Sequence, residues 1–209
     1  MKRFVFTAGL ACALAIPGAA LAQTPPSAPQ SSKPPASSKA GTAAPQGSLA
    51  AADKTFMMKA ARGGMAEVEL GRLATEKASS ADVKQFGQRM VDDHGKANDE
   101  LKGLASQKNV TLPADLDAKH KATRDRLSKL SGAAFDKAYM ADMVADHNAD
   151  VAEFARVSKR AKDADVKAFA AKTLPTLQEH QRLAKEVAGK VGGTAARAGA
   201  AHKTHKKSD

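Results

Sequence analysis

Apolar residues recur every three to four positions through almost all of residues 53–189, and this periodicity constrains the fold more than any other feature of the sequence. An apolar stripe with that spacing lies on one face of an α-helix, which buries the stripe against other helices. Aromatic residues make up only 4% of the chain and strand-like alternation is nearly absent, so we predict an all-α protein. The stripe is divided by Ser, Asp, Gly and Pro residues into five predicted helices, at residues 53–78, 80–108, 113–130, 132–161 and 163–189. The predicted N-terminal caps are Asp53, Ser79 or Ser80, Ser131 and Asp163.

The lengths of the connections predict how the helices pair. The first and second predicted helices are joined by a turn of about two residues, as are the fourth and fifth, so each pair forms an antiparallel hairpin. The third, at residues 113–130, would span about 27 Å as a helix, long enough to carry the chain back along most of the bundle. The predicted fold is therefore a ferritin-like four-helix bundle with an extra crossover helix between the two hairpins.

The N-terminus has the three parts of a secretory signal peptide, which we assign to residues 1–22. Lys2 and Arg3 precede an apolar run that ends at Pro17, and Ala20-Leu21-Ala22 supplies small residues for cleavage. The apolar run is shorter than the roughly 20 residues that span a bilayer. We therefore expect an exported protein of the periplasm or outer envelope, without cysteine after cleavage because Cys12 lies in the signal.

Two low-complexity segments flank the predicted bundle of residues 53–189. Residues 23–52 carry six of the nine prolines among Ser, Ala and Gln, and residues 190–209 form a basic tail, so we predict that both are disordered. The formal net charge of +11 lies largely in such terminal segments, since residues 53–188 hold 24 basic and 21 acidic side chains. With one Tyr and no Trp to stack on bases, the chain does not resemble a nucleic-acid-binding protein. The tails are suited to weak contact with an anionic envelope surface.

Four of the predicted helices each place one ionisable side chain in the middle of the apolar stripe. These residues are Glu67, His94, His147 and His180. They lie 12 to 17 residues from the hairpin turns, or about 18 to 26 Å along their helices, so we expect them to share one layer near mid-bundle. Asp150 lies on the same inward stripe as His147, whereas Glu69 points outward.

A buried layer of imidazoles and carboxylates needs a partner, because each such group is costly in an apolar core unless it is paired or bound to a metal. Three histidines with Glu67, and Asp150 in reserve, would suit zinc, iron or copper. Met90 and Met143, each four residues before a histidine, would favour copper in its softer state. The alternative is a closed hydrogen-bond network that needs no metal.

The remaining polar residues suggest simpler interpretations. We interpret His120 as a single histidine satisfied by its neighbours, and Asp92 and Asp93 as a solvated edge of their helix. No nucleophile elbow, phosphate-binding glycine loop or cysteine-based site is recognisable in the sequence. The sequence therefore favours a non-catalytic role over an enzymatic one, and it predicts no oligomeric state.

Four motifs resemble an exported bacterial family called domain of unknown function 4142. They are Gly63-Gly64-Met65-Ala66-Glu67-Val68-Glu69-Leu70-Gly71, Met90-Val91-Asp92-Asp93-His94, Gly132-Ala133-Ala134-Phe135-Asp136-Lys137-Ala138-Tyr139 and Thr173-Leu174-Pro175-Thr176-Leu177. The resemblance implies a ferritin-like helical protein of the envelope, with no established activity. The Glu-x-x-His motifs of iron-oxidising ferritins are missing, because Val91, Val144 and Leu177 stand three residues before the histidines.

Three functional hypotheses follow. The first is an exported helical bundle that binds, senses or buffers a metal ion through Glu67, His94, His147 and His180, with Asp150 in reserve. The second is a structural or stress-related envelope protein whose buried polar layer only fixes helix register. The third is a ferritin-like oxidoreductase.

Overall fold

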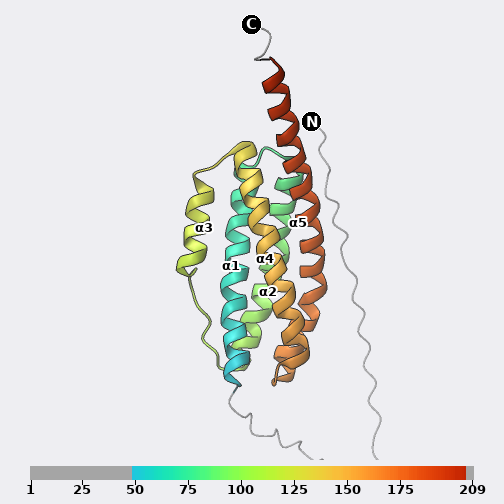
Figure 1. Ribbon diagram of the computed structural model, residues 1–209. Coiled ribbons are helices and arrows are strands. Elements are labelled where there is room, and N and C mark those ends of the chain that lie inside the picture. Colours follow the sequence, from blue (N-terminus) through green and yellow to red (C-terminus); the bar gives the residue numbers. More distant parts are fainter. Residues whose placement is uncertain (1–48, 206–209) are drawn as a thin grey trace, which may run out of the picture. The chain divides into compact units, whose positions relative to one another are not determined.

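The described part of the chain is entirely helical (Figure 1). The computed structural model describes the backbone of residues 49–205 and the side chains of residues 49–193; the predicted signal peptide and nearly all of the predicted linker lie outside these residues. Within them there are no strands, which confirms the all-α prediction. The five helices are α1 (Ala51–Lys77), α2 (Ala81–Gln107), α3 (Ala118–Ser128), α4 (Gly132–Arg160) and α5 (Ala164–His205). No helix among the described residues combines the length and the apolar character needed to cross a membrane.

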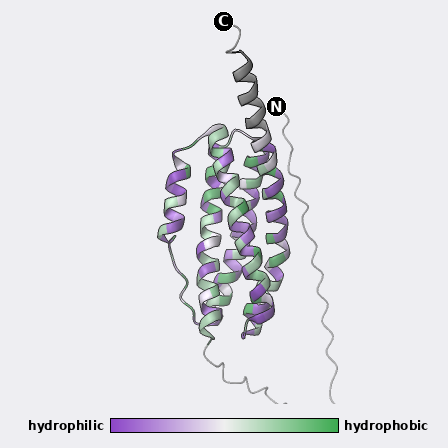
Figure 2. Ribbon diagram, in the orientation of Figure 1, coloured by the Kyte–Doolittle hydropathy of each residue, from purple (hydrophilic) through white to green (hydrophobic). Residues whose placement is uncertain are grey.

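The four long helices pack mainly in two pairs that follow the chain order. α1 packs along α2 and α4 along α5, and smaller contacts join α2 to α5 and α1 to α4 (Figure 1). The connections at residues 78–80 and 161–163 are so short that the chain must reverse its direction there, so each pair is an antiparallel hairpin. α3 lies against α1 and α4 and is mostly hydrophilic (Figure 2), with Leu127 as its one buried residue.

Two buried aspartates tie each pair of helices to the turn of the other. Asp53, near the start of α1, accepts hydrogen bonds from the backbone N–H groups of Lys162 and Asp163 at 2.9 and 2.8 Å. Asp136, near the start of α4, accepts from the N–H groups of Ser79 and Ser80 at the other turn. The predicted role of Asp53 as an N-terminal cap was therefore wrong, because α1 begins two residues earlier and the carboxylate satisfies donors of a distant turn instead.

The other predicted caps fare differently. Asp163 accepts from the N–H groups of Asp165 and Val166 as a cap should. Ser80 and Ser131 precede α2 and α4 but make no capping bond with their side chains.

Two predicted helix boundaries also need correction. α3 has 11 residues and is about 16 Å long, whereas 18 residues were predicted. The chain is non-helical from residue 111 to Asp117, whose side chain accepts a hydrogen bond from the N–H of His120 and so caps the helix. Buried Val110 and Leu116 hold this stretch against the protein. α5 continues past its predicted end at residue 189 to His205, through most of the predicted tail, because the alanines that follow Gly193 favour helix.

The core consists of two hydrophobic clusters, one towards each end of the four long helices. The first cluster includes Phe56, Leu101, Phe154 and Phe169. The second includes Leu70, Phe86, Tyr139 and Met143. Along every long helix the predicted polar residue falls between members of the two clusters, as His94 does between Met90 and Leu101. The polar layer therefore lies at the boundary between the clusters.

Candidate metal centre

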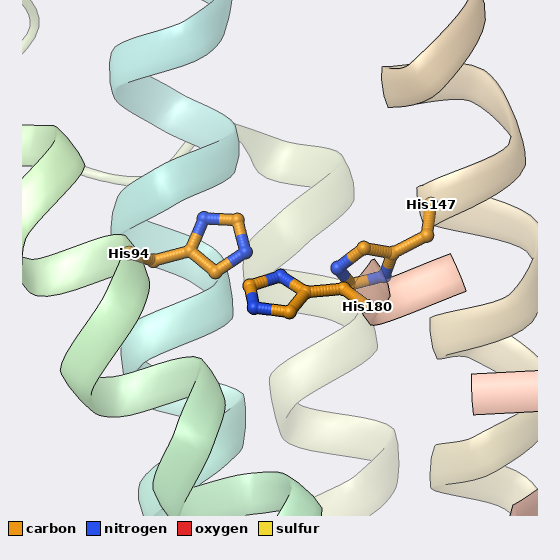
Figure 3. A group of neighbouring side chains, drawn as sticks. All are labelled: His94, His147 and His180. Atoms are coloured by element: carbon orange, nitrogen blue, oxygen red, sulfur yellow. The ribbon is translucent and has the colours of Figure 1, made fainter. Parts of the chain in front are cut away.

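Three histidines from three helices meet in this layer. His94 of α2, His147 of α4 and His180 of α5 each offer one ring nitrogen, and the three nitrogens lie within 4.8 Å of one another. Their ring centroids are 5.3 to 5.8 Å apart, and Figure 3 shows the rings turned towards one another. The side chains are almost inaccessible to solvent, with exposures of 7%, 0% and 1% in the order given. The predicted convergence of these three residues is present in the structure.

Hydrogen bonds to the rest of the protein occupy one nitrogen on each of two rings. Nδ1–H of His147 donates to the Met143 carbonyl oxygen at 2.9 Å. Nε2–H of His180 donates to Asp93 Oδ2 at 3.0 Å. These bonds assign the tautomers and leave the opposite nitrogens as lone-pair donors. Nε2 of His147 and Nδ1 of His180 have no hydrogen-bond partner, and neither does Nε2 of His94.

Asp93 has a role that the sequence analysis missed. Its side chain is 29% exposed, so it lies at the edge of α2 as predicted, but it also bonds to His180 across the contact between α2 and α5. A carboxylate that accepts the outer N–H of a histidine orients the ring and raises the basicity of its free nitrogen. The interpretation of Asp93 as a solvated edge was therefore incomplete, because a helix wheel of α2 alone does not show which residue of α5 faces it.

Burial keeps the three imidazoles neutral and ready to bind a metal. It lowers the pKa of His94 well below the ordinary value of 6.5, and a positive charge on His180 or His147 would lower it further. It lowers the pKa of His147 to about 4. For His180, burial also lowers the pKa, although the bond to Asp93 works against this. Protons therefore compete weakly for the lone pairs at neutral pH.

Glu67 lies beside this group rather than in it. Its Oε1 atom is 3.9 Å from Nδ1 of His147, the nitrogen already bonded to Met143, and its buried Oε2 atom has no partner. Burial raises the pKa of Glu67 well above its usual range, and the negative charges of Asp150 and Asp146 add to this. Of the four predicted ligands, only the three histidines therefore come together, and Glu67 lies next to the outer nitrogen of His147.

Asp150, the reserve ligand, is also outside the group of three nitrogens. It is half-buried, and burial with the charge of Asp146 raises its pKa to about 6. His120 lies away from the centre as well, with Nδ1 2.9 Å from Asp117 Oδ1. This contact lacks hydrogen-bond geometry and the buried Nδ1 atom has no hydrogen-bond partner, so the interpretation of His120 as a histidine satisfied by its neighbours is not confirmed.

Two cavities reach His94. The larger, of about 480 Å³, is bounded by α1, α2, α4, α5 and the start of α3, and it includes Glu67 and Asp150 in its lining. The smaller, of about 160 Å³, lies between α2 and α5 and is lined by both His94 and His180. The candidate centre is thus buried but bordered by space on its α2 side.

The lowered pKa of His147 predicts a pH-dependent stability for the metal-free protein. The unfolded chain takes up a proton near pH 6.5 and the folded protein only near pH 4, so the stability from the neutral imidazole is present above pH 6.5 and lost as the pH falls. We expect wild type to lose about 2 kcal/mol of unfolding free energy relative to His147→Gln between pH 6.5 and pH 5. Urea unfolding with a chelator present measures this difference.

The comparison with His147→Gln isolates one group. The raised pKa values of Glu67 and Asp150 act in the opposite sense, but they are common to both proteins. A difference between the two proteins that does not change with pH would contradict the assignment of His147 as a buried neutral imidazole.

Comparisons with known proteins support the fold and are silent on activity. The profile of the family described as "Domain of unknown function (DUF4142)" matches residues 38–187. A solved structure described as a DUF305 fragment from Deinococcus radiodurans is similar, with a TM-score of 0.61 and 12% sequence identity over 69% of this chain and 99% of that one. No curated protein matches the chain. At this identity the structural likeness indicates a shared fold alone.

Proposed function

The chain belongs to the family called domain of unknown function 4142, and we propose that it binds one transition-metal ion between His94, His147 and His180. Two observations carry the proposal: each of the three rings has a buried nitrogen without a hydrogen-bond partner, and the rings offer one ligand nitrogen each within 4.8 Å of one another. Buried polar atoms are normally hydrogen-bonded, so three orphans at one point need a common partner. A metal ion supplies it.

The chemistry of the three nitrogens fits such an ion. Metal–nitrogen bonds of about 2.0–2.1 Å place the ligands of a tetrahedral site roughly 3.3 Å apart, which small side-chain movements would reach from the present spacing. Three neutral imidazoles suit Zn²⁺, Cu²⁺ or Fe²⁺. They leave at least one coordination position for water, and the support of His180 by Asp93 is typical of metal-bound histidines.

The competing hypothesis is a layer of hydrogen bonds that fixes helix register. The bond of His180 on α5 to Asp93 on α2 favours it. However, a closed network would also satisfy Oε2 of Glu67 and the three free imidazole nitrogens, and these atoms have no partners. The metal hypothesis accounts for the nitrogens and is therefore preferred. The oxidoreductase hypothesis ranks third, because no carboxylate of the described residues joins the group of three histidines.

We extend the proposal to the setting of the site. The two hairpins and the intervening α3 are best interpreted as a ferritin-like four-helix bundle in which α3 belongs to the crossover connection. Export to the periplasm or outer envelope is proposed from the signal sequence at residues 1–22, and weak contact with anionic envelope surfaces from the basic C-terminal residues. In this setting the protein would hold, buffer or sense the metal rather than transform a substrate.

Metal stoichiometry tests the proposal. Protein purified without a His-tag is stripped with chelator and loaded with Zn²⁺, Cu²⁺ or anaerobic Fe²⁺, each alone, and bound metal is counted after desalting. We expect one ion per chain for at least one metal. We expect none in His94→Ala/His147→Ala and one in the control His120→Ala. No retained ion in wild type, or full retention in the double variant, would contradict the proposal.

A further inference from the structure

The larger cavity connects the histidine layer to the surface along a line of carboxylates. At its outer end lie the exposed Lys59 and Lys119, and at its inner end the buried Glu67 and His94. Asp146, Asp150 and Glu153 of α4 line it, at a spacing of four and then three residues that puts them on one helix face. Its lining therefore holds five carboxyl groups, with Asp117 as the fifth, against the three basic side chains of Lys59, Arg62 and Lys119.

Two of these carboxylates lack the partners that buried acids usually have. The side chain of Asp150 is half-buried and, within the described part of the chain, has neither a hydrogen bond nor an ion pair. Glu67 is 3% exposed and its Oε2 atom is unpartnered. By contrast, Glu153 is paired with Arg156 and Asp146 lies 3.9 Å from Lys119. The cost of leaving the Asp150 carboxyl group and Oε2 of Glu67 without a partner suggests that a cation visits them.

The smaller cavity lacks this character. Its lining contains Lys96 and Lys172 as well as Asp93 and Glu100, so that formal charges balance. Glu100 is held by Lys172 at 2.7 Å, and Asp93 by His180. Nothing in this lining would attract a free cation, although the cavity touches two of the histidines.

We propose that the larger cavity is the route by which a hydrated divalent cation reaches the three histidines, with Asp150 and then Glu67 as transient ligands. This inference rests on the proposed metal site. Carboxylates bind such cations without stripping their water completely, and a concave acidic surface raises the local cation concentration. The ion then exchanges oxygen ligands for the imidazole nitrogens at the inner end, beside His94.

The rate of Zn²⁺ uptake tests this route. Stopped-flow mixing of metal-free full-length protein with Zn²⁺ alone, followed by a fluorescent indicator of free Zn²⁺, gives the association rate, and competition with a chelator gives the affinity. We expect Asp150→Asn to slow both uptake and release about tenfold at low salt and to leave Kd nearly unchanged, because a transient ligand lowers the barrier equally in both directions. Salt should slow uptake by wild type more than uptake by the variant.

Glu100→Gln is the matched control, because it neutralises a carboxylate on the smaller cavity. We expect it to leave the uptake rate unchanged. A second variant, Gly63→Leu, tests the route by volume: Gly63 lines the larger cavity, and a Cβ atom added there meets no atom within 4 Å. Its side chain should obstruct the cavity and slow uptake and release together.

The outcomes separate this inference from the metal site itself. If wild type binds one Zn²⁺ but Asp150→Asn and Gly63→Leu take it up at the wild-type rate, or Glu100→Gln is the slow variant, the route is wrong and the site stands. If Asp150→Asn loses affinity as much as speed, Asp150 is a resident ligand and the transient role is overturned. If wild type binds no divalent ion, both proposals fail.

Discussion

Replacing His147 with alanine is expected to weaken metal binding by more than about 100-fold. Loss of a residue that only hydrogen-bonds to a metal ligand typically weakens binding by at most about 100-fold, and loss of a ligand should weaken it more. His147 has no solvent exposure, its Nδ1–H is fixed on the Met143 carbonyl, and its Nε2 is free. The substitution removes one of the three proposed ligands. No neighbouring side chain can take its place, since no other His, Cys, Asp or Glu among the described residues joins the group. Isothermal titration with the metal that binds stoichiometrically measures the loss.

A graded series makes this result specific. Asp93→Ala, which removes only the partner of His180, should weaken binding by about 10- to 100-fold. Glu179→Gln, next to His180 but on the exposed face, is the control and should bind as wild type does. Equal losses in all three variants would indicate general destabilisation, and an unchanged affinity in His147→Ala would show that the ion binds elsewhere.

Replacing Gly71 or Gly87 with alanine is expected to lower the free energy of unfolding by about 3 kcal/mol, as overpacking of a rigid contact does. These glycines lie where α1 and α2 pack closely. A Cβ atom on Gly71 would be 2.6 Å from the Gly87 carbonyl oxygen, and one on Gly87 would be 2.6 Å from Ala74 Cβ and 2.8 Å from the Gly71 carbonyl oxygen. A single backbone atom within a helix cannot move without the rest of the helix, so the two helices must move apart to relieve the clash. Denaturant unfolding measures the change.

Gly103→Ala in α2 is the matched control, and it should change stability in the opposite sense. A Cβ atom at Gly103 meets nothing within 4 Å, so alanine there brings only its higher helix propensity, a gain of about 1 kcal/mol. Gly71→Ala or Gly87→Ala variants as stable as wild type would show that α1 and α2 are not packed as closely as described.

The pattern of apolar residues was sufficient to predict the four long helices and their pairing. Periodicity fixes the inward face of each helix, and a two-residue connection allows only a hairpin, so Glu67 was correctly predicted to be buried and Glu69 to lie outside the core. The shorter α3 was harder to predict, because only Leu127 of that helix is buried and its apolar stripe is correspondingly weak. Its start depends on the cap at Asp117, whereas Pro113 had suggested an earlier one.

The site was predictable where it depends on single helices and not where it depends on pairs of helices. Counting residues from the turns placed the three histidines at one depth, and they do meet. Counting residues does not give the rotation of one helix about its axis relative to the next. That rotation places Asp93 opposite His180, and it leaves Glu67 Oε1 3.9 Å from Nδ1 of His147, the nitrogen already hydrogen-bonded to Met143. The link from Asp53 to the turn between α4 and α5 was missed for the same reason.

The most direct test of the metal centre is anomalous X-ray diffraction from crystals of the metal-loaded protein, recorded above and below the absorption edge of the bound metal. The account predicts one anomalous peak bounded by Nε2 of His94, Nε2 of His147 and Nδ1 of His180, with each nitrogen about 2.1 Å away. A peak at any other residues, or imidazoles hydrogen-bonded to one another with no peak between them, would contradict it.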